Sequence, residues 1–153
     1  MTHYQQRLKI KTTGKSFSNI TRNVQSVVAT SGLETGLCTI FLRHTSASLV
    51  IQENADPDVL MDLSNFFAKL VPEDGKSYIH SAEGSDDMPA HIRTALTKTS
   101  EQIPIAQGRL LLGTWQGIYI WEHRRQAHYR EVVVHIAGNS SQPLSTRING
   151  DQY

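Results

Sequence analysis

Residues 37–70 read LCTIFLRHTSASLVIQENADPDVLMDLSNFFAKL, and this stretch decides the kind of fold that the chain can adopt. Two short runs, residues 37–43 and 47–52, are apolar and rich in β-branched side chains, which predicts two strands that meet at His44. Asp56 and Pro57 then have the types expected of an N-cap and a first helical residue, and an apolar stripe at helical spacing follows them. Strand, strand and helix in this order favour an α+β fold.

The rest of the chain adds strands and two further helices. Apolar residues at helical spacing predict a helix over residues 18–30, and a third helix is expected to begin at Asp87 or Met88, with Pro89 in its first turn. Strands are predicted over residues 4–11, 102–105, 109–112, 115–122 and 130–136. The sequence therefore predicts one α+β domain with a large antiparallel β component and about three helices.

One domain accounts for residues 1–138, since no linker and no repeat of fixed period interrupts them. Residues 139–153 are predicted to be a polar C-terminal tail, because they are rich in Ser, Asn, Gln and Gly and offer little apolar surface to a core. The domain prediction is therefore a single unit followed by this tail.

Composition limits the classes of partner. Fifteen Lys and Arg against fourteen Asp and Glu leave a formal charge of +1, so no overall field attracts nucleic acid or a membrane surface. The apolar runs are shorter than the roughly 18 residues of a spanning helix, and the polar N-terminus has no signal-peptide core. The single cysteine, Cys38, lies in a predicted strand and fits a reducing compartment. We therefore expect a cytoplasmic protein with no membrane partner and no nucleic-acid partner.

Three of the seven histidines are candidate metal ligands. His44, His80 and His91 lie at element ends or in loops, where side chains from separate elements can converge. Three imidazoles and a water would form an open site for a divalent cation such as zinc. The motifs HExxH and CxxC are absent, so the fold would have to bring such ligands together. The other interpretation is that they are ordinary hydrogen-bonded side chains, as we expect for His123.

Two polar segments are candidate substrate sites. Glu53, Asn54 and Asp56 follow a predicted strand and precede a helix N-terminus, a place that suits an anion or a carboxylate-bound cation, although Asp56 can equally be a simple cap. Thr114 and Gln116 lie between Gly113 and Gly117, where a backbone can approach a ligand closely, and a hairpin turn would look the same. Phosphate-loop and dinucleotide motifs are absent.

Four motifs occur together in this chain: HTSASL at 44–49, ENADPD at 53–58, PAHI at 89–92 and LGTWQGI at 112–118. In this combination the chain resembles the YjbQ family from about Tyr4 to Ile136. The resemblance implies an α+β fold with packed, sandwich-like antiparallel sheets and a homotrimeric assembly. After Ile120 the chain departs from the family, because WEHRRQAH at 121–128 stands where many relatives resemble CEFDGPR.

The resemblance also implies a site and an activity. The activity is that of a secondary thiamine-phosphate synthase, which joins a pyrimidine carried on a pyrophosphate leaving group to a thiazole phosphate. A divalent metal, zinc or, for the pyrophosphate substrate, magnesium, would offset charge on the departing oxygens. The candidate residues are His44, His80 and His91 as metal ligands, Asp56 and Glu53 as catalytic groups, and Thr45, Ser46, Asn54, Thr114 and Gln116 as substrate-binding groups.

Two alternative functions use the same residues. One is metal-assisted hydrolysis of a small phosphorylated metabolite, and the other is a non-catalytic trimer that binds a metal or a metabolite. The predicted strand over residues 115–122 bears on assembly, because Trp115 and Trp121 would share one face and Ile118 and Ile120 the other. One face can pack in the core, and the other needs cover from a helix or a neighbouring subunit. We expect a homotrimer.

Overall fold

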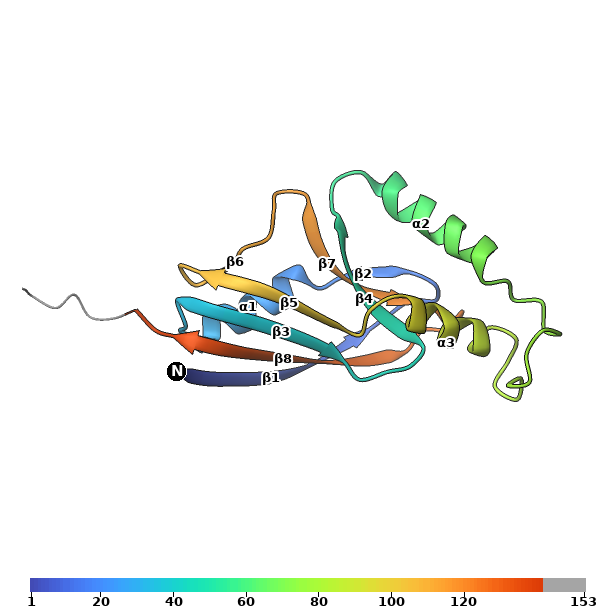
Figure 1. Ribbon diagram of the computed structural model, residues 1–153, viewed down its shortest axis with the longest axis horizontal. Helices are drawn as coiled ribbons and strands as arrows, with labels where there is room; N and C mark the ends of the chain where they lie inside the picture. The colour runs from blue at the N-terminus through green and yellow to red at the C-terminus, as the bar shows by residue number, and fades with distance from the viewer. Residues whose placement is uncertain (142–153) are drawn as a thin grey trace, which may run out of the picture.

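The computed structural model describes residues 1–141, which form three helices and two antiparallel sheets (Figure 1). The larger sheet has the strand order β1-β8-β3-β5-β6 and the smaller one the order β2-β7-β4. The strands are β1 (Thr2–Lys11), β2 (Phe17–Asn19), β3 (Thr35–Leu42), β4 (Ala47–Glu53), β5 (Ser100–Ala106), β6 (Arg109–Leu110), β7 (Gln116–Glu122) and β8 (Tyr129–Asn139). The helices are α1 (Thr21–Ser31), α2 (Pro57–Leu70) and α3 (Asp87–Leu96). The predicted α+β class is confirmed.

The core lies where the two sheets and α1 meet. Alternate residues of β3 and β8 point into it, as the period of a strand requires, and Ile40 and Val134, which face each other across the two strands, are fully buried. From the smaller sheet, β7 contributes Ile118 and Ile120. Cys38 is buried here, and burial raises the pKa of its thiol to about 12.

The first helix begins later than its apolar spacing predicts. Residues Phe17–Asn19 pair with β7 as the short strand β2, and α1 starts only at Thr21. The side chain of Asn19 accepts hydrogen bonds from the backbone N–H and the hydroxyl of Thr21, at 3.0 and 2.7 Å. A pairing partner about a hundred residues away decided this boundary, which local periodicity cannot reveal.

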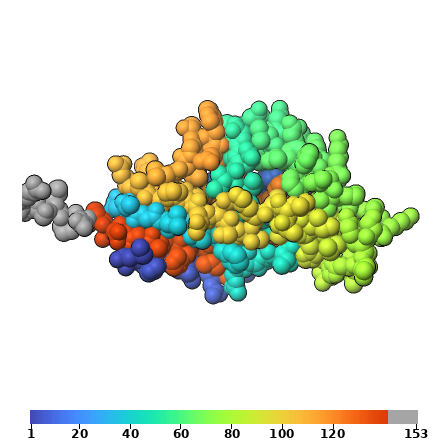
Figure 2. Space-filling model, in the orientation of Figure 1, coloured from blue at the N-terminus to red at the C-terminus, as the bar shows by residue number. Residues whose placement is uncertain are grey.

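α2 and α3 lie at the end of the molecule away from the N-terminus, with the connecting segment beyond them (Figures 1 and 2). Asp56 is the N-cap of α2, and its Oδ1 accepts a hydrogen bond from the Asp58 N–H at 2.9 Å. The ring of Phe67 packs edge-on against Trp121, with centroids 4.8 Å apart. Trp121 is only 5% exposed, so it is covered within this chain, in part by α2.

The domain limit predicted at residue 138 stays a prediction. β8 ends at Asn139, one residue beyond the expected limit of the domain, and residues 142–153 of the predicted polar tail lie outside the described part of the chain. None of the helices within residues 1–141 has the length and apolar character needed to span a membrane.

Candidate metal centre

Two of the predicted histidines, His80 and His91, converge on one carboxylate, that of Asp87. The Nε2 atoms of His80 and His91 lie 2.6 and 3.1 Å from Asp87 Oδ2. Asp87 opens α3 and His91 follows it by four residues, so the helix places both on one face. His80 comes from the segment between α2 and α3. The ligand atoms of all three lie within 4.8 Å of one another, which is close enough to hold a metal ion.

The turn between β7 and β8 supplies Arg124, which binds the other oxygen of the Asp87 carboxylate. Arg124 Nη1 donates to Asp87 Oδ1 at 2.6 Å, and its Nε donates to the neighbouring carboxylate of Asp86 at 2.9 Å. Burial raises the pKa of Asp87, but the hydrogen bond from His80 and the charges of His91 and Arg124 outweigh it, so the pKa lies below its usual value. The side chain is 2% exposed and yet ionised, with Oδ2 turned to the two imidazoles.

The hydrogen bonds of His91 set its tautomer. Its Nδ1 lies 2.8 Å from the carbonyl oxygen of Thr45, and because a carbonyl can only accept, Nδ1 must carry a hydrogen. In the neutral ring, Nε2 then presents a lone pair to the ionised Asp87 oxygen. Two acceptors at 3.1 Å require a positive species between them, either a second ring proton or a metal ion.

His44, predicted as the third ligand, is not part of this cluster. Its Nε2 accepts a hydrogen bond from the backbone N–H of Glu131 at 2.7 Å. Burial and the charge of Arg130 lower the pKa of His44, so the ring is neutral and its hydrogen is on Nδ1. In this arrangement neither nitrogen offers a free lone pair. His44 instead lines, with Thr45 and His91, a cavity of about 410 Å³ beside the cluster.

Four of the other predicted site residues lie near the two ends of β4. Thr45 and Ser46 precede the strand beside His91, whereas Glu53 ends it and Asp56 caps the next helix. Seven residues at about 3.3 Å each separate these ends by roughly 20 Å. Glu53 and Asp56 therefore do not reach the histidine cluster within one chain.

Asn54, Thr114 and Gln116 do come together, and they bind one another. The amide of Asn54 donates to the carbonyl oxygens of Thr114 and Gln116 at 3.2 and 3.4 Å, and the Gln116 side chain accepts from the Gly113 N–H at 2.8 Å. These contacts tie the turn before β7 to the end of β4. Their predicted contact with a substrate stays a prediction.

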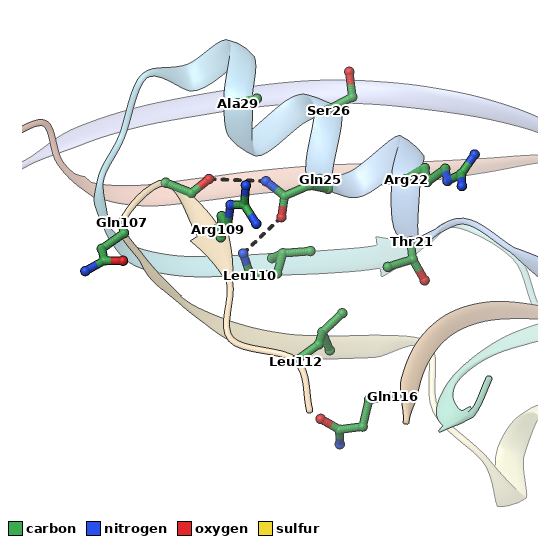
Figure 3. A pocket seen from close by; sticks show the side chains of 11 residues that line it. Thr21, Arg22, Gln25, Ser26, Ala29, Gln107, Arg109, Leu110, Leu112 and Gln116 are labelled. Atoms are coloured by element: carbon green, nitrogen blue, oxygen red, sulfur yellow. Dashed lines mark hydrogen bonds between the residues drawn. The ribbon is translucent and has the colours of Figure 1, made fainter. Parts of the chain in front are cut away.

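A larger cavity of about 770 Å³ lies elsewhere, between α1 and the turn into β6 (Figure 3). Gln25 is among its lining residues: its amide nitrogen donates to the Gly108 carbonyl at 3.2 Å, and its amide oxygen accepts from the Leu110 N–H at 3.0 Å. Its lining has no carboxylate and no histidine, so it lacks the donor set of the His80–Asp87–His91 cluster.

Sequence reasoning missed Asp87 and Arg124 as parts of the site. The spacing of Asp87 and His91, four residues apart at the start of a predicted helix, was a local signal that could have identified the carboxylate. Arg124 comes from a turn 37 residues further on, and no local signal marks it.

Known proteins are similar to this chain over most of its length. A UPF0047 protein from Synechocystis is 67% identical over 135 residues, which cover 88% of this chain and 92% of the relative. The YjbQ protein of Salmonella typhimurium is 42% identical over 88% of this chain and 98% of its own length. A crystal structure of an uncharacterized conserved YjbQ/UPF0047 protein from Clostridium acetobutylicum is 40% identical, covers 86% of this chain and 98% of its own, and superposes with a TM-score of 0.79.

These relatives match almost the whole described domain, and the family matches the chain over a similar range. Residues 6–139 fit the family described as UPF0047 protein YjbQ-like. That range runs from β1 to the last residue of β8 and contains the whole His80–Asp87–His91 cluster. The chain therefore belongs to the YjbQ-like UPF0047 family.

Proposed function

We propose that the chain is a divalent-metal-dependent enzyme that acts on a phosphorylated small molecule, with its metal held by His80, Asp87 and His91. The supporting observation is the convergence of His80 Nε2, His91 Nε2 and a carboxylate oxygen of Asp87, three ligand atoms that all lie within 4.8 Å of one another. Two imidazoles and one carboxylate are also a donor set of catalytic zinc sites, in which the fourth position stays open to water or substrate.

The side chains around the cluster suit this role. The Thr45 carbonyl holds the tautomer of His91, and Arg124 holds Asp87, as outer contacts of metal ligands commonly do. His80 and His91 are 44% and 31% exposed, so solvent and a ligand can reach them. A divalent cation at this place would polarise a phosphate oxygen and offset the charge that develops on it.

The leading reaction is that of the secondary thiamine-phosphate synthase, in which the pyrimidine is joined to the thiazole phosphate and pyrophosphate leaves. Support comes from the family resemblance and from the cavity of about 410 Å³ that adjoins His91, where Thr45 also lies. Magnesium would arrive with the pyrophosphate. Ser46, whose hydroxyl accepts from Arg130 at 3.0 Å, is the other predicted substrate-binding residue at this end of β4.

Elemental analysis of the purified full-length protein tests the metal centre. We expect about one zinc per chain in the wild type, with iron(II) as the other metal that this donor set accepts. The His91→Gln variant should not retain the metal. His44→Gln is the matched control, because a glutamine oxygen can still accept from the Glu131 N–H and His44 lies outside the cluster. Equal metal content in the two variants, or none in zinc-supplemented wild type, would contradict the proposal.

Product analysis tests the reaction. The zinc-loaded protein is incubated with the two thiamine precursors and, separately, with a panel of phosphate monoesters. Formation of thiamine phosphate that His91→Gln abolishes would support the synthase. Turnover of the monoesters alone would replace it with a hydrolase, and absence of both activities in a metal-loaded protein would favour a binding function.

We also propose that the chain assembles as a homotrimer. No residue of α2 is buried, although the helix carries an apolar stripe. Phe66 and Leu70, one turn apart on its surface, are 60% and 53% exposed. Contiguous apolar surface of this kind is characteristic of an interface, which supports contact of α2 with a neighbouring subunit.

A further inference from the structure

The cavity of about 770 Å³ beside α1 lies at the other end of the molecule from α3 and the His80–Asp87–His91 cluster (Figures 1 and 3). One wall is a single face of α1, because the residues of the helix that line it follow its 3.6-residue period: Arg22, Gln25, Ser26 and Ala29. The other wall comes from the chain between Gln107 and Leu112. A volume of this size is typical of a small-molecule site.

Two arginines line this cavity, and they differ from the other arginines of the described chain. Within residues 1–141, each of the others forms an ion pair with a carboxylate, namely Arg7, Arg43, Arg93, Arg124, Arg125 and Arg130. Arg22 and Arg109 form none in this part of the chain. The lining contains no carboxylate, and Glu34, which lies beside Gly108, pairs with neither arginine. The cavity therefore carries two uncompensated positive charges.

The fold keeps these two arginines close together. The Gln25 amide donates to the Gly108 carbonyl at 3.2 Å and accepts from the Leu110 N–H at 3.0 Å, so it binds the residues on both sides of Arg109. Arg22 precedes Gln25 by three residues on the same face of α1, one helical turn away. Figure 3 shows Arg109 beside the Gln25 amide and Arg22 on the neighbouring turn. Both arginines are exposed, and their long side chains can turn to one anion.

A phosphate monoester matches this pair of charges. The guanidinium group presents a planar fork of N–H donors that fits the oxygens of a phosphate. A phosphate monoester carries about two negative charges near pH 7, whereas a carboxylate carries one. Two arginines without a counter-charge therefore favour phosphate as the head group.

The cavity also has room and apolar surface for more than a head group. Leu110 and Leu112 line it, and both are only partly buried against the core. A cavity of about 150 Å³ already holds benzene, so this one can accept an organic group beside the phosphate. Gln116, which the sequence predicts to contact a substrate, is also part of the lining.

We propose that this cavity binds an organic phosphate, with the phosphate held by Arg22 and Arg109 and the organic group packed against Leu110 and Leu112. The site uses none of the residues of the His80–Asp87–His91 cluster. It therefore stands or falls independently of the proposed reaction.

Calorimetric titration of the full-length protein tests this site. The probe is 1-naphthyl phosphate, with neutral 1-naphthol as the control for the rings and inorganic phosphate as the control for the head group. We expect one saturable site per chain with a Kd below about 1 mM. Inorganic phosphate should bind at least about tenfold more weakly, because it has no apolar group, and 1-naphthol should not saturate. The His91→Gln variant should bind like the wild type, which separates this site from the proposed metal centre.

Matched variants locate the bound phosphate. Arg22→Gln and Arg109→Gln each remove one charge from an exposed side chain and should weaken binding about tenfold. Arg7→Gln makes the same change in an exposed arginine of β1 that does not line the cavity, and its affinity should stay within about twofold. Ala29→Trp fills the cavity from an exposed position of α1 without a change of charge, so it should abolish binding.

Three results would overturn the proposal. The first is the absence of a saturable signal with 1-naphthyl phosphate up to about 10 mM. The second is equal weakening by Arg7→Gln and Arg109→Gln, which would reduce the effect to general charge attraction. The third is undiminished binding by Ala29→Trp, or loss of binding in His91→Gln, because either would place the phosphate outside this cavity.

Discussion

Glu122 and Arg130 form a buried ion pair that joins the two sheets. Arg130 Nε and Nη2 donate to the two oxygens of Glu122 at 2.8 and 2.5 Å. Glu122 ends β7 of the smaller sheet, Arg130 lies in β8 of the larger one, and they are 1% and 4% exposed. The hydroxyl of Thr12 donates to the same carboxylate at 2.7 Å, so the pair is closely hydrogen-bonded. These contacts lower the pKa of Glu122 below its usual value, although burial alone would raise it.

Glu122→Gln should destabilise the protein by about 3 kcal/mol, because it leaves the guanidinium of Arg130 buried without a counter-charge. Urea denaturation at pH 7, with an unchanged slope, is the measurement. Glu131→Gln is the control: Glu131 pairs with Arg43 at 2.8 Å on the surface, and its loss should have a much smaller effect. Equal losses of stability in the two variants would show that the buried Glu122–Arg130 pair contributes no more than a surface ion pair.

His123 should make the fold sensitive to mild acid. Its folded pKa of about 3 lies below the ordinary 6.5, so the unfolded chain binds a proton at pH values where the folded chain does not. Its contribution to stability is therefore complete above pH 6.5 and is lost as the pH falls from 6.5 towards 3, by at most about 1.4 kcal/mol per pH unit.

Urea midpoints between pH 7 and 5 measure this loss, in a window above the titration of most carboxylates. His44, whose pKa is also lowered, acts in the same direction, so the comparison is with His123→Gln. That variant should have a shallower pH dependence. An identical slope would mean that His123 is not responsible.

Local sequence signals predicted much of the fold. Asp56 and Pro57 marked the start of α2 because capping and the geometry of proline are properties of adjacent residues. The β-branched runs around His44 likewise predicted β3 and β4. The start of α1 was misplaced, because Phe17 pairs with Trp121 and such long-range pairing leaves no local trace.

The site was predicted only in part, for a similar reason. The sequence identified His80 and His91, which the fold brings together, but whether an imidazole is a ligand depends on what its nitrogens already bind. His44 is engaged by the backbone of Glu131, 87 residues away, and Asp87 is held by Arg124 from another turn. Neither relationship could be found without the register of β3 against β8 and the position of the β7–β8 turn.

Arg124 is expected to be a positioning residue for the proposed metal centre. Arg124→Lys removes the fork that holds Asp86 and Asp87 together, so zinc affinity should fall by about 10- to 100-fold, as is usual for outer contacts of metal ligands. Competition with a chromophoric chelator measures the affinity, and circular dichroism checks the fold. Arg125→Lys is the control because the Arg125 side chain pairs with Glu73 instead. Unchanged affinity in Arg124→Lys would show that Asp87 needs no support from this turn.

The last prediction concerns the outer face of α2. If Phe66 and Leu70 pack against a neighbouring subunit, changing both to Glu should dissociate the assembly, because it would bury two unpaired charges in the interface. Light scattering at micromolar concentration should give about 51 kDa for the wild type, three times the 17.1 kDa of one chain, and a mass near one chain for the double variant.

Lys69→Glu is the control variant, because it adds negative charge to the same helix without removing apolar surface, and it should remain a trimer. Because no α2 residue is buried within the chain, the dissociated variant should keep its circular dichroism spectrum. A wild type that scatters as a single chain would rule out the trimer, and a double variant that keeps the trimeric mass would place the interface on another surface.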